Sequence, residues 1–141
     1  FGVNASYTDW SSFKMLQLNY ANPLQAQYNA PDIFNYKSSW FGSIGGEYRM
    51  DDQWTLRAGV AYDQTPTTNA TRDPKIPDNS RKWLAFGVGY KYNANLQFDA
   101  GYVHLFLNDS TVNDLSPTFD ALSGTFKLSG NVLTVSARYT F

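Results

Sequence analysis

The sequence offers few residues for covalent or metal chemistry. His104 is the only histidine, and there is no cysteine. A nucleophilic enzyme needs a nucleophile, a base and an orienting group within reach of one another, and no motif places a serine and an aspartate beside His104. A metal ion would need a site built from carboxylates, and the pair Asp51-Asp52 is too short for one and is typical of a turn. The sequence therefore predicts a protein that is not an enzyme and that uses no metal or cofactor.

Cations and prolines gather in and just after residues 64–81, which form the best candidate for a binding site. Pro66, Pro74 and Pro77 restrict the backbone of this segment. Arginine can hold a carboxylate through two parallel hydrogen bonds, so the segment favours an anionic ligand. The alternatives are that these charges bind lipid phosphates or only keep the loop in water. The cationic candidates are Arg72, Lys75, Arg81 and Lys82, with Lys37 near the preceding loop.

Apolar residues in the predicted loops could hold an alkyl chain beside these cations. The alternative is that they pack the loops together or touch lipid headgroups, and the sequence favours neither. The candidates are Leu24, Tyr28, Ile33, Phe34, Leu115, Phe119 and Leu122.

The elements that position these residues are predicted to be two-faced strands. In residues 53–63, Trp54, Leu56, Ala58, Val60 and Tyr62 alternate with polar or small residues, which is the period of a strand with one apolar face. An aromatic residue stands at each end, and a tilted strand of this length covers most of the hydrocarbon core of a bilayer. Similar strands are predicted over residues 81–92, 96–106 and 127–141, and weaker ones over 40–50 and 2–18, the last with a bulge near Asp9-Trp10.

Charged residues share the other face of these strands. In a barrel this face lines the lumen, where charges are normal. They could form a fixed network that fills the lumen, a polar path, or a docking surface, and we expect Glu47 and Arg57 to pair because they lie on neighbouring strands. The set is Glu47, Arg49, Arg57, Asp63, Lys91, Asp99 and Arg138.

Short and long connections alternate along the chain. Residues 50–53 and 93–95 form short turns, whereas residues 21–36, 64–80 and 108–126 form long loops. This alternation is typical of bacterial outer-membrane barrels, with short turns in the periplasm and long loops outside. The fold class predicted for residues 1–141 is therefore all-β, as about six strands of an antiparallel transmembrane β-barrel.

Composition agrees with this fold and excludes others. Mean hydropathy is −0.42 and no run of about 18 apolar residues occurs, so no transmembrane helix is expected. The net charge of −1 without a basic block argues against nucleic acid as a partner. A barrel needs about eight strands, and an open edge in lipid leaves backbone groups unpaired. Since no signal peptide is present either, the chain is expected to be a mature protein or a fragment, and to need further strands or further copies to close a barrel.

Specific segments resemble one family of outer-membrane proteins. The last residues, Leu133, Val135, Ala137, Tyr139 and Phe141, resemble the bacterial outer-membrane targeting pattern. A stronger resemblance, to the FadL family, is carried by residues 7–13 (YTDWSSF), 45–48 (GGEY) and 52–66 (DQWTLRAGVAYDQTP). It continues through residues 72–74 (RDP), 76–78 (IPD), Arg81, 89–90 (GY) and 99–102 (DAGY).

The resemblance implies a fold and a function. Family members form closed barrels of about fourteen strands with an N-terminal hatch, and this chain corresponds to the C-terminal third. Its expected partners are a hydrophobic ligand, outer-membrane lipid, the rest of the barrel and the hatch. The implied function is passive uptake of hydrophobic small molecules, most of all long-chain fatty acids, across the bacterial outer membrane. The family places the segment from Ile76 to Arg81 at the mouth of the ligand pocket, which supports Arg81 as a ligand residue.

Three other functions stay open at this point. Relatives in the family take up aromatic hydrocarbons, which need no cationic anchor. A structural or adhesive barrel would only present loops at the surface. A soluble β-sandwich would bury the face that runs from Trp54 to Tyr62 against a second sheet.

Overall fold

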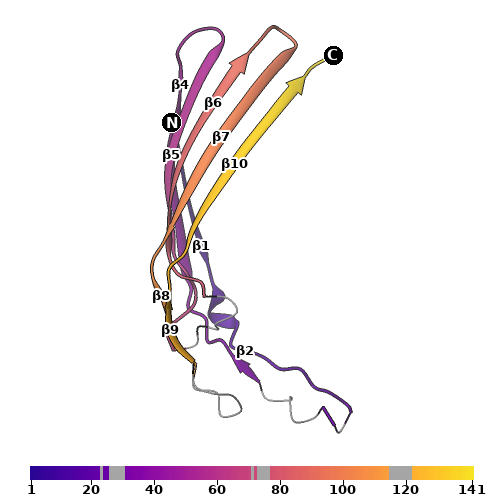
Figure 1. Cartoon of the computed structure of the whole chain (residues 1–141), viewed down its shortest axis with the longest axis vertical. Helices are drawn as coiled ribbons and strands as arrows, with labels where there is room; N and C mark the ends of the chain where they lie inside the picture. The colour runs from indigo at the N-terminus through magenta and orange to yellow at the C-terminus, as the bar shows by residue number, and fades with distance from the viewer. Residues whose placement is uncertain (23, 26–30, 71, 73–76, 115–121) are drawn as a thin grey trace.

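The computed structural model, shown in Figure 1, describes residues 1–22, 24–25, 31–70, 72, 77–114 and 122–141. Six long antiparallel strands form one sheet in the order β1-β4-β5-β6-β7-β10. This arrangement confirms the predicted all-β class and the six predicted strands. Their bounds are β1 Gly2–Thr8, β4 Ser39–Arg49, β5 Trp54–Asp63, β6 Arg81–Lys91, β7 Leu96–Leu107 and β10 Ser129–Tyr139.

Two tight turns join neighbouring strands at one end of the sheet, here called the turn end (Figure 1). In the turn between β4 and β5, Asp51 Oδ1 accepts hydrogen bonds from the backbone N–H groups of Gln53 and Trp54, at 2.8 and 2.6 Å. In the turn between β6 and β7, Asn93 Oδ1 accepts from Asn95 and Leu96, at 2.8 and 2.9 Å. Asp and Asn favour turns through such bonds to their own backbone. The opposite end of the sheet, where the long connections lie, is called the loop end.

The strand register sorts the side chains into an outer face and an inner face. Val60 lies opposite Ile44 and Leu84, and Arg57 lies opposite Glu47 and Gly87. The outer face comprises the even-numbered residues of β4–β7 and the odd-numbered residues of β1 and β10, and the inner face comprises the others. Every apolar set predicted from the period of two falls on the outer face.

No second sheet covers the outer face in the described part of the chain. Val60, Phe86 and Val135 are 50%, 53% and 75% exposed. Among the described residues, Val112 is the only buried hydrophobic one. The alternative of a soluble β-sandwich is therefore wrong, because a sandwich would bury this face.

Aromatic side chains border the outer face at both ends. Tyr7 and Trp40 pack at the loop end as a tilted pair with ring centroids 4.9 Å apart, and Trp54 and Tyr90 pack at the turn end as a tilted pair at 4.5 Å. Such rings prefer membrane interfaces, since one end is apolar and the other can reach water. The outer face thus has an apolar band between two aromatic girdles.

The segment after β1 differs from the prediction of one bulged strand over residues 2–18. Asp9 accepts from the backbone N–H of Ser11 and from the hydroxyl of Ser38, at 3.0 and 2.8 Å, and caps a short 3-10 helix, η1 (Trp10–Ser12). Hydrogen bonds from Ser11 and then Ser38 hold the pKa of Asp9 below its ordinary value. The loss of phase near Asp9 is therefore a helical cap and not a bulge. No helix among the described residues is long and apolar enough to cross a membrane.

Two small sheets lie outside the main sheet, one between the predicted strand over residues 2–18 and the loop over 21–36, and one within the predicted loop over 108–126. β2 (Met15–Leu16) pairs with β3 (Asp32–Ile33), and β8 (Ser110–Asp114) pairs with β9 (Leu122–Phe126). The prediction of residues 108–126 as plain loop is thus incomplete, because the hairpin extends the chain of β7 beyond the main sheet.

The exposed outer face yields a test of its lipid contact. Ala58 lies midway between Trp54 and Tyr62, whereas Ser129 lies opposite Phe106 near the loop end. In the full-length protein that contains this chain, Ala58→Arg should cost about 2–4 kcal/mol of unfolding free energy in liposomes, and Ser129→Arg about 0–1 kcal/mol. Denaturant unfolding measures both variants. Equal costs at the two positions would contradict a membrane-embedded outer face.

Candidate functional site

The turn-end half of the inner face carries an ionic network across four strands. Arg57 on β5 lies with its Nε 3.5 Å from a Glu47 oxygen on β4, and its Nη1 donates to Asp99 Oδ1 on β7 at 2.8 Å. The expected pairing of Arg57 with Glu47 is present. Gln97 also donates to Asp99, at 3.0 Å. Each of these ions keeps part of its surface exposed, so the network is a wetted lining and not a buried core.

Two glycines of β6 make room for Arg57 to cross that strand. Gly87 lies directly opposite Arg57, and Gly89 lies directly opposite Asp99. A Cβ atom at Gly89 would lie 2.9 Å from Asp99 Oδ1 and 3.3 Å from Arg57 Nη1. Glycine at this position is therefore what allows the guanidinium to reach the second strand along.

The other predicted lumen charges are held less firmly. Arg49 lies 4.0 Å from Glu47, and its side chain is 80% exposed. Arg138 lies on the inner face opposite Gln97, and it has no ion pair among the described residues. The structure brings Glu47, Arg57 and Asp99 together and leaves Arg49 and Arg138 at the margin.

The loop-end half of the inner face carries a set of apolar side chains that was not predicted from the sequence. Trp83 of β6 lies opposite Leu105 of β7, and both side chains are half-buried. The Trp83 indole N–H is buried and has no hydrogen-bond partner among the described residues. The signal was available in the sequence, because these residues have the same strand parity as Arg57 and Asp99. This apolar wall consists of Phe41, Trp83, Val103, Leu105 and Leu107.

Arg81 lies on the inner face directly opposite Leu107 of the apolar wall, two residues from Trp83 on the same strand. Its Nη2 donates to Asp78 Oδ1 at 2.9 Å, and its Nε lies 3.4 Å from Asp63 Oδ2. Two carboxylates therefore share one guanidinium. An anionic ligand would have to compete with them for Arg81.

Arg72, predicted as a ligand-binding residue, lies in a buried position where its guanidinium is hydrogen-bonded within the protein. The residue is only 6% exposed. Its Nε donates to the carbonyl of Asp78, and its Nη1 donates to Asn69 Oδ1 and to the carbonyl of Thr111, each at 2.8 Å. A guanidinium is a suitable group to satisfy several carbonyls at once. Arg72 thus fastens the loop before β6 to the β8 strand.

Lys37 and Phe34 lie in the loop before β4. The Lys37 backbone N–H donates to the carbonyl of Pro66 at 2.9 Å, which places Lys37 beside the loop before β6. Its side chain is exposed and has no ion pair among the described residues. Lys75, Tyr28, Leu115 and Phe119 lie outside the described residues, while Leu24, Ile33 and Leu122 are exposed.

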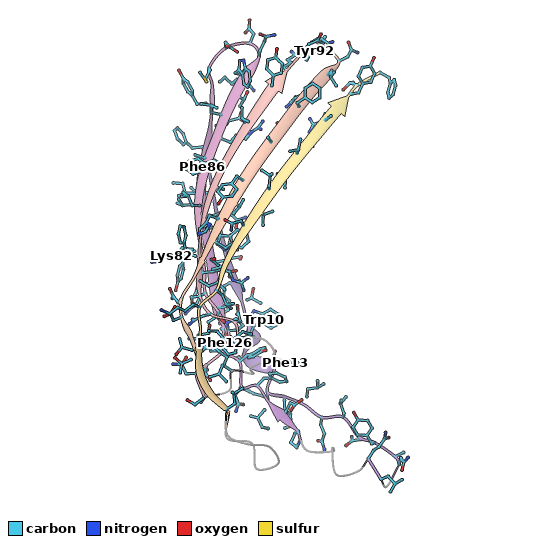
Figure 2. All side chains as sticks on the ribbon, in the orientation of Figure 1. Trp10, Phe13, Lys82, Phe86, Tyr92 and Phe126 are labelled. Carbon is cyan, nitrogen blue, oxygen red and sulfur yellow. The ribbon has the colours of Figure 1, made fainter. Side chains whose placement is uncertain are left out.

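Phe34 belongs to an aromatic cluster at the loop end. Its ring centroid lies 5.3 Å from that of Phe13 and 5.4 Å from that of Tyr36, and Tyr36 meets Trp10 edge-on at 6.4 Å. Figure 2 shows Trp10 and Phe13 beyond the loop end of the long strands. The aromatic cluster gives a hydrophobic surface near the mouth of the inner face.

His104 is remote from the inner face. It lies on the outer face opposite Leu84, and its Nδ1 is hydrogen-bonded to Asn131 Oδ1 at 2.7 Å. In the described part of the chain, no group of three or more His, Asp or Glu side chains could hold a metal ion.

Comparison with known proteins places this geometry in a family. A family model described as "Outer membrane protein transport protein (OMPP1/FadL/TodX)" matches residues 1–141. The crystal structure of a Pseudomonas aeruginosa FadL homologue matches with a TM-score of 0.83 and 38% identity, over 97% of this chain and 31% of that one.

Curated relatives agree with the family model. Outer membrane protein P1 of Haemophilus influenzae is 34% identical over 70% of this chain, and the long-chain fatty acid transport protein of Escherichia coli K12 is 33% identical over 70%. The chain spans 21% and 22% of the lengths of these two relatives. The chain belongs to the OMPP1/FadL/TodX family of outer-membrane transport proteins, and it is a β-barrel segment of the bacterial outer membrane.

Proposed function

We propose that the full-length protein takes up hydrophobic small molecules passively across the outer membrane. The apolar wall of the inner face carries this proposal. In a water-filled lumen, the half-buried side chains of Trp83 and Leu105 expose apolar area to water. An apolar ligand that covers both side chains removes that area from water. No nucleophile, metal or cofactor is required, so the proposed function is transport and not catalysis.

The two halves of the inner face suggest a route. A ligand would meet the aromatic cluster at the loop end, pass Arg81, and settle on the apolar wall. Further movement toward the turn end would bring it against Arg57 and Asp99, whose desolvation would be costly. A hydrophobic ligand is therefore expected to leave the lumen toward the membrane without crossing the ionic network.

Long-chain fatty acids are the first candidate substrate. Relatives carry the name long-chain fatty acid transport protein, and an alkyl chain with a carboxylate fits an apolar wall that has cations at its edge. Arg81 is shared with Asp63 and Asp78, so it supplies less attraction than a free arginine. Lys37 has no described ion pair and is the second anchor. An aromatic hydrocarbon would use the wall alone, and it is the alternative substrate.

The ionic network is proposed to stiffen the sheet and to form the surface that contacts the hatch. Its position at the turn end leaves the loop-end half free for the ligand. Arg57 on β5 also reaches Asp99 on β7, a strand with which β5 shares no ladder.

Replacing an apolar wall residue should weaken uptake. Leu105→Asn keeps the size of the side chain but removes its affinity for an alkyl chain, so the substrate concentration for half-maximal uptake of oleate should rise about tenfold. Ser136→Asn, at the turn-end half of the inner face, is the matched control. Uptake is measured in liposomes that contain the full-length protein. Unchanged uptake by the folded Leu105→Asn variant would contradict the proposal.

The cationic anchors distinguish the two substrate classes. Arg81→Gln and Lys37→Gln should each lower oleate uptake several-fold and leave toluene uptake unchanged, because only oleate carries a carboxylate. Both substrates are measured on the same preparation. Equal losses for oleate and toluene would exclude a carboxylate anchor, and losses for neither would favour the aromatic-hydrocarbon alternative.

The ionic network predicts a coupling that can be measured directly. A double-mutant cycle of Arg57→Met and Asp99→Asn in the full-length protein should give a coupling of about 1 kcal/mol or less in unfolding free energy, since the pair is partly exposed. The same cycle on Arg49 and Glu47 serves as control and should give none. A coupling energy of zero for the Arg57–Asp99 pair would show that this ion pair does not stiffen the sheet.

A further inference from the structure

The outer face carries a single formal charge. Of all residues that β1, β4, β5, β6, β7 and β10 place on this face, only Lys82 is a lysine, arginine, aspartate or glutamate. It lies near the loop end, opposite Tyr62 on β5 and Phe106 on β7. Its side chain is exposed and has no ion pair among the described residues. Figure 2 shows Lys82 and Phe86 projecting from the same side of the sheet.

A polar cluster lies diagonally beside Lys82 on the same face. Asn131 Oδ1 accepts a hydrogen bond from the hydroxyl of Tyr102 at 2.7 Å and lies 2.7 Å from His104 Nδ1. Since the carbonyl oxygen of Asn131 is used in this way, its amide N–H groups remain as donors without a described partner. His104 on β7 is the diagonal neighbour of Lys82, about 7–8 Å away, and Asn131 lies opposite His104 one strand further along, on β10. Lys82 and Asn131 therefore present donors, and no carboxylate, to one region of the membrane interface.

An apolar hollow continues from this cluster toward the turn end. Its volume is about 810 Å³. Nine of its fourteen lining residues lie on the outer face, and a tenth, Phe1, directly precedes β1. Tyr102 joins the two features, because its ring lines the hollow and its hydroxyl belongs to the polar cluster. The small side chains of Ala58 and Ala100 line the hollow together with larger ones. The larger ones include Tyr48, Leu56, Phe86 and Leu133.

We propose that this part of the outer face is a binding site for a phosphorylated, acylated lipid of the outer leaflet. An acyl chain lies in the hollow over Ala100, and the phosphate is bound by Lys82 and the Asn131 amide. The predicted orientation, with the long loops outside, brings the donors to the headgroup level of that leaflet. Lysine extends its ammonium toward the interface while its carbon chain stays on apolar surface.

Charge complementarity selects this occupant over others. A neutral lipid without a phosphate would gain little from one unpaired cation beside two amide N–H groups. A second protein copy would bury Lys82 and the polar cluster without a described acidic partner on the same face. An anionic headgroup with attached acyl chains satisfies the donors and fills the hollow at once.

The test measures lipid binding to the full-length protein. Purified diphosphorylated lipid A is titrated into the detergent-solubilised protein, and the bound lipid is counted by native mass spectrometry. Lys82→Gln should weaken binding about tenfold, since it removes a charge-assisted hydrogen bond. Asn131→Asp keeps the oxygen that Tyr102 and His104 use but replaces the amide donors by a negative charge, so it should weaken binding by at least as much. Ala100→Phe fills the hollow and should weaken binding without any change of charge.

The controls separate this lipid site from nonspecific charge attraction and from a substrate site. Lys14→Gln removes a positive charge from a loop and should bind lipid A as the parent does. Inorganic phosphate should not displace lipid A at millimolar concentration, because it has no acyl chain. Equal binding by the parent, Lys82→Gln and Asn131→Asp would overturn the proposal, as would displacement of lipid A by oleate, which would make the hollow a substrate site. Oleate uptake is measured on the same variants, so loss of lipid binding and loss of transport are distinguished.

Discussion

The hydrogen-bond ladder of the six-stranded sheet is the constraint on which the rest of the structure depends. Hydrocarbon offers no hydrogen-bond partner, so every backbone N–H and C=O that crosses it must be paired within the protein. The unbroken registers from β1 to β10 meet that demand and fix which side chains face lipid. They also leave β1 and β10 as edges, which need partners in a membrane. This requirement agrees with a chain that spans only 31% of the matched FadL homologue.

The same ladder divides the inner face into two zones with different chemistry. Near the turn end, Arg57 crosses β6 over two glycines to reach Asp99, and the surface is wet and charged. Near the loop end, Trp83 and Leu105 give an apolar wall under the rim where Arg81 lies between two aspartates. A hydrophobic ligand can lower its free energy on the second zone and not on the first. The proposed uptake depends on this difference, while the proposed lipid site depends on the outer face alone.

The sequence predicted the main sheet well, because a period of two determines both the strands and their faces. It predicted the Glu47–Arg57 pair for the same reason, since the residues lie opposite each other across one turn. Other features depend on contacts distant in the chain. Arg72 became a structural residue through the carbonyl of Thr111, which lies 39 residues away. The apolar wall was not predicted, because the period of two was used to assign only polar and small residues to the inner face. The odd number of Trp83 in its strand nevertheless places it on that face.

Quenching of Trp83 fluorescence tests the central claim, that an apolar ligand occupies the inner face. The full-length protein, with Trp83 as its single tryptophan, is reconstituted in liposomes. A dibrominated long-chain fatty acid should quench this tryptophan saturably, while phospholipids brominated in their acyl chains should leave it bright. Quenching by the brominated phospholipids, with none by the fatty acid, would put Trp83 in contact with the bilayer and contradict the account.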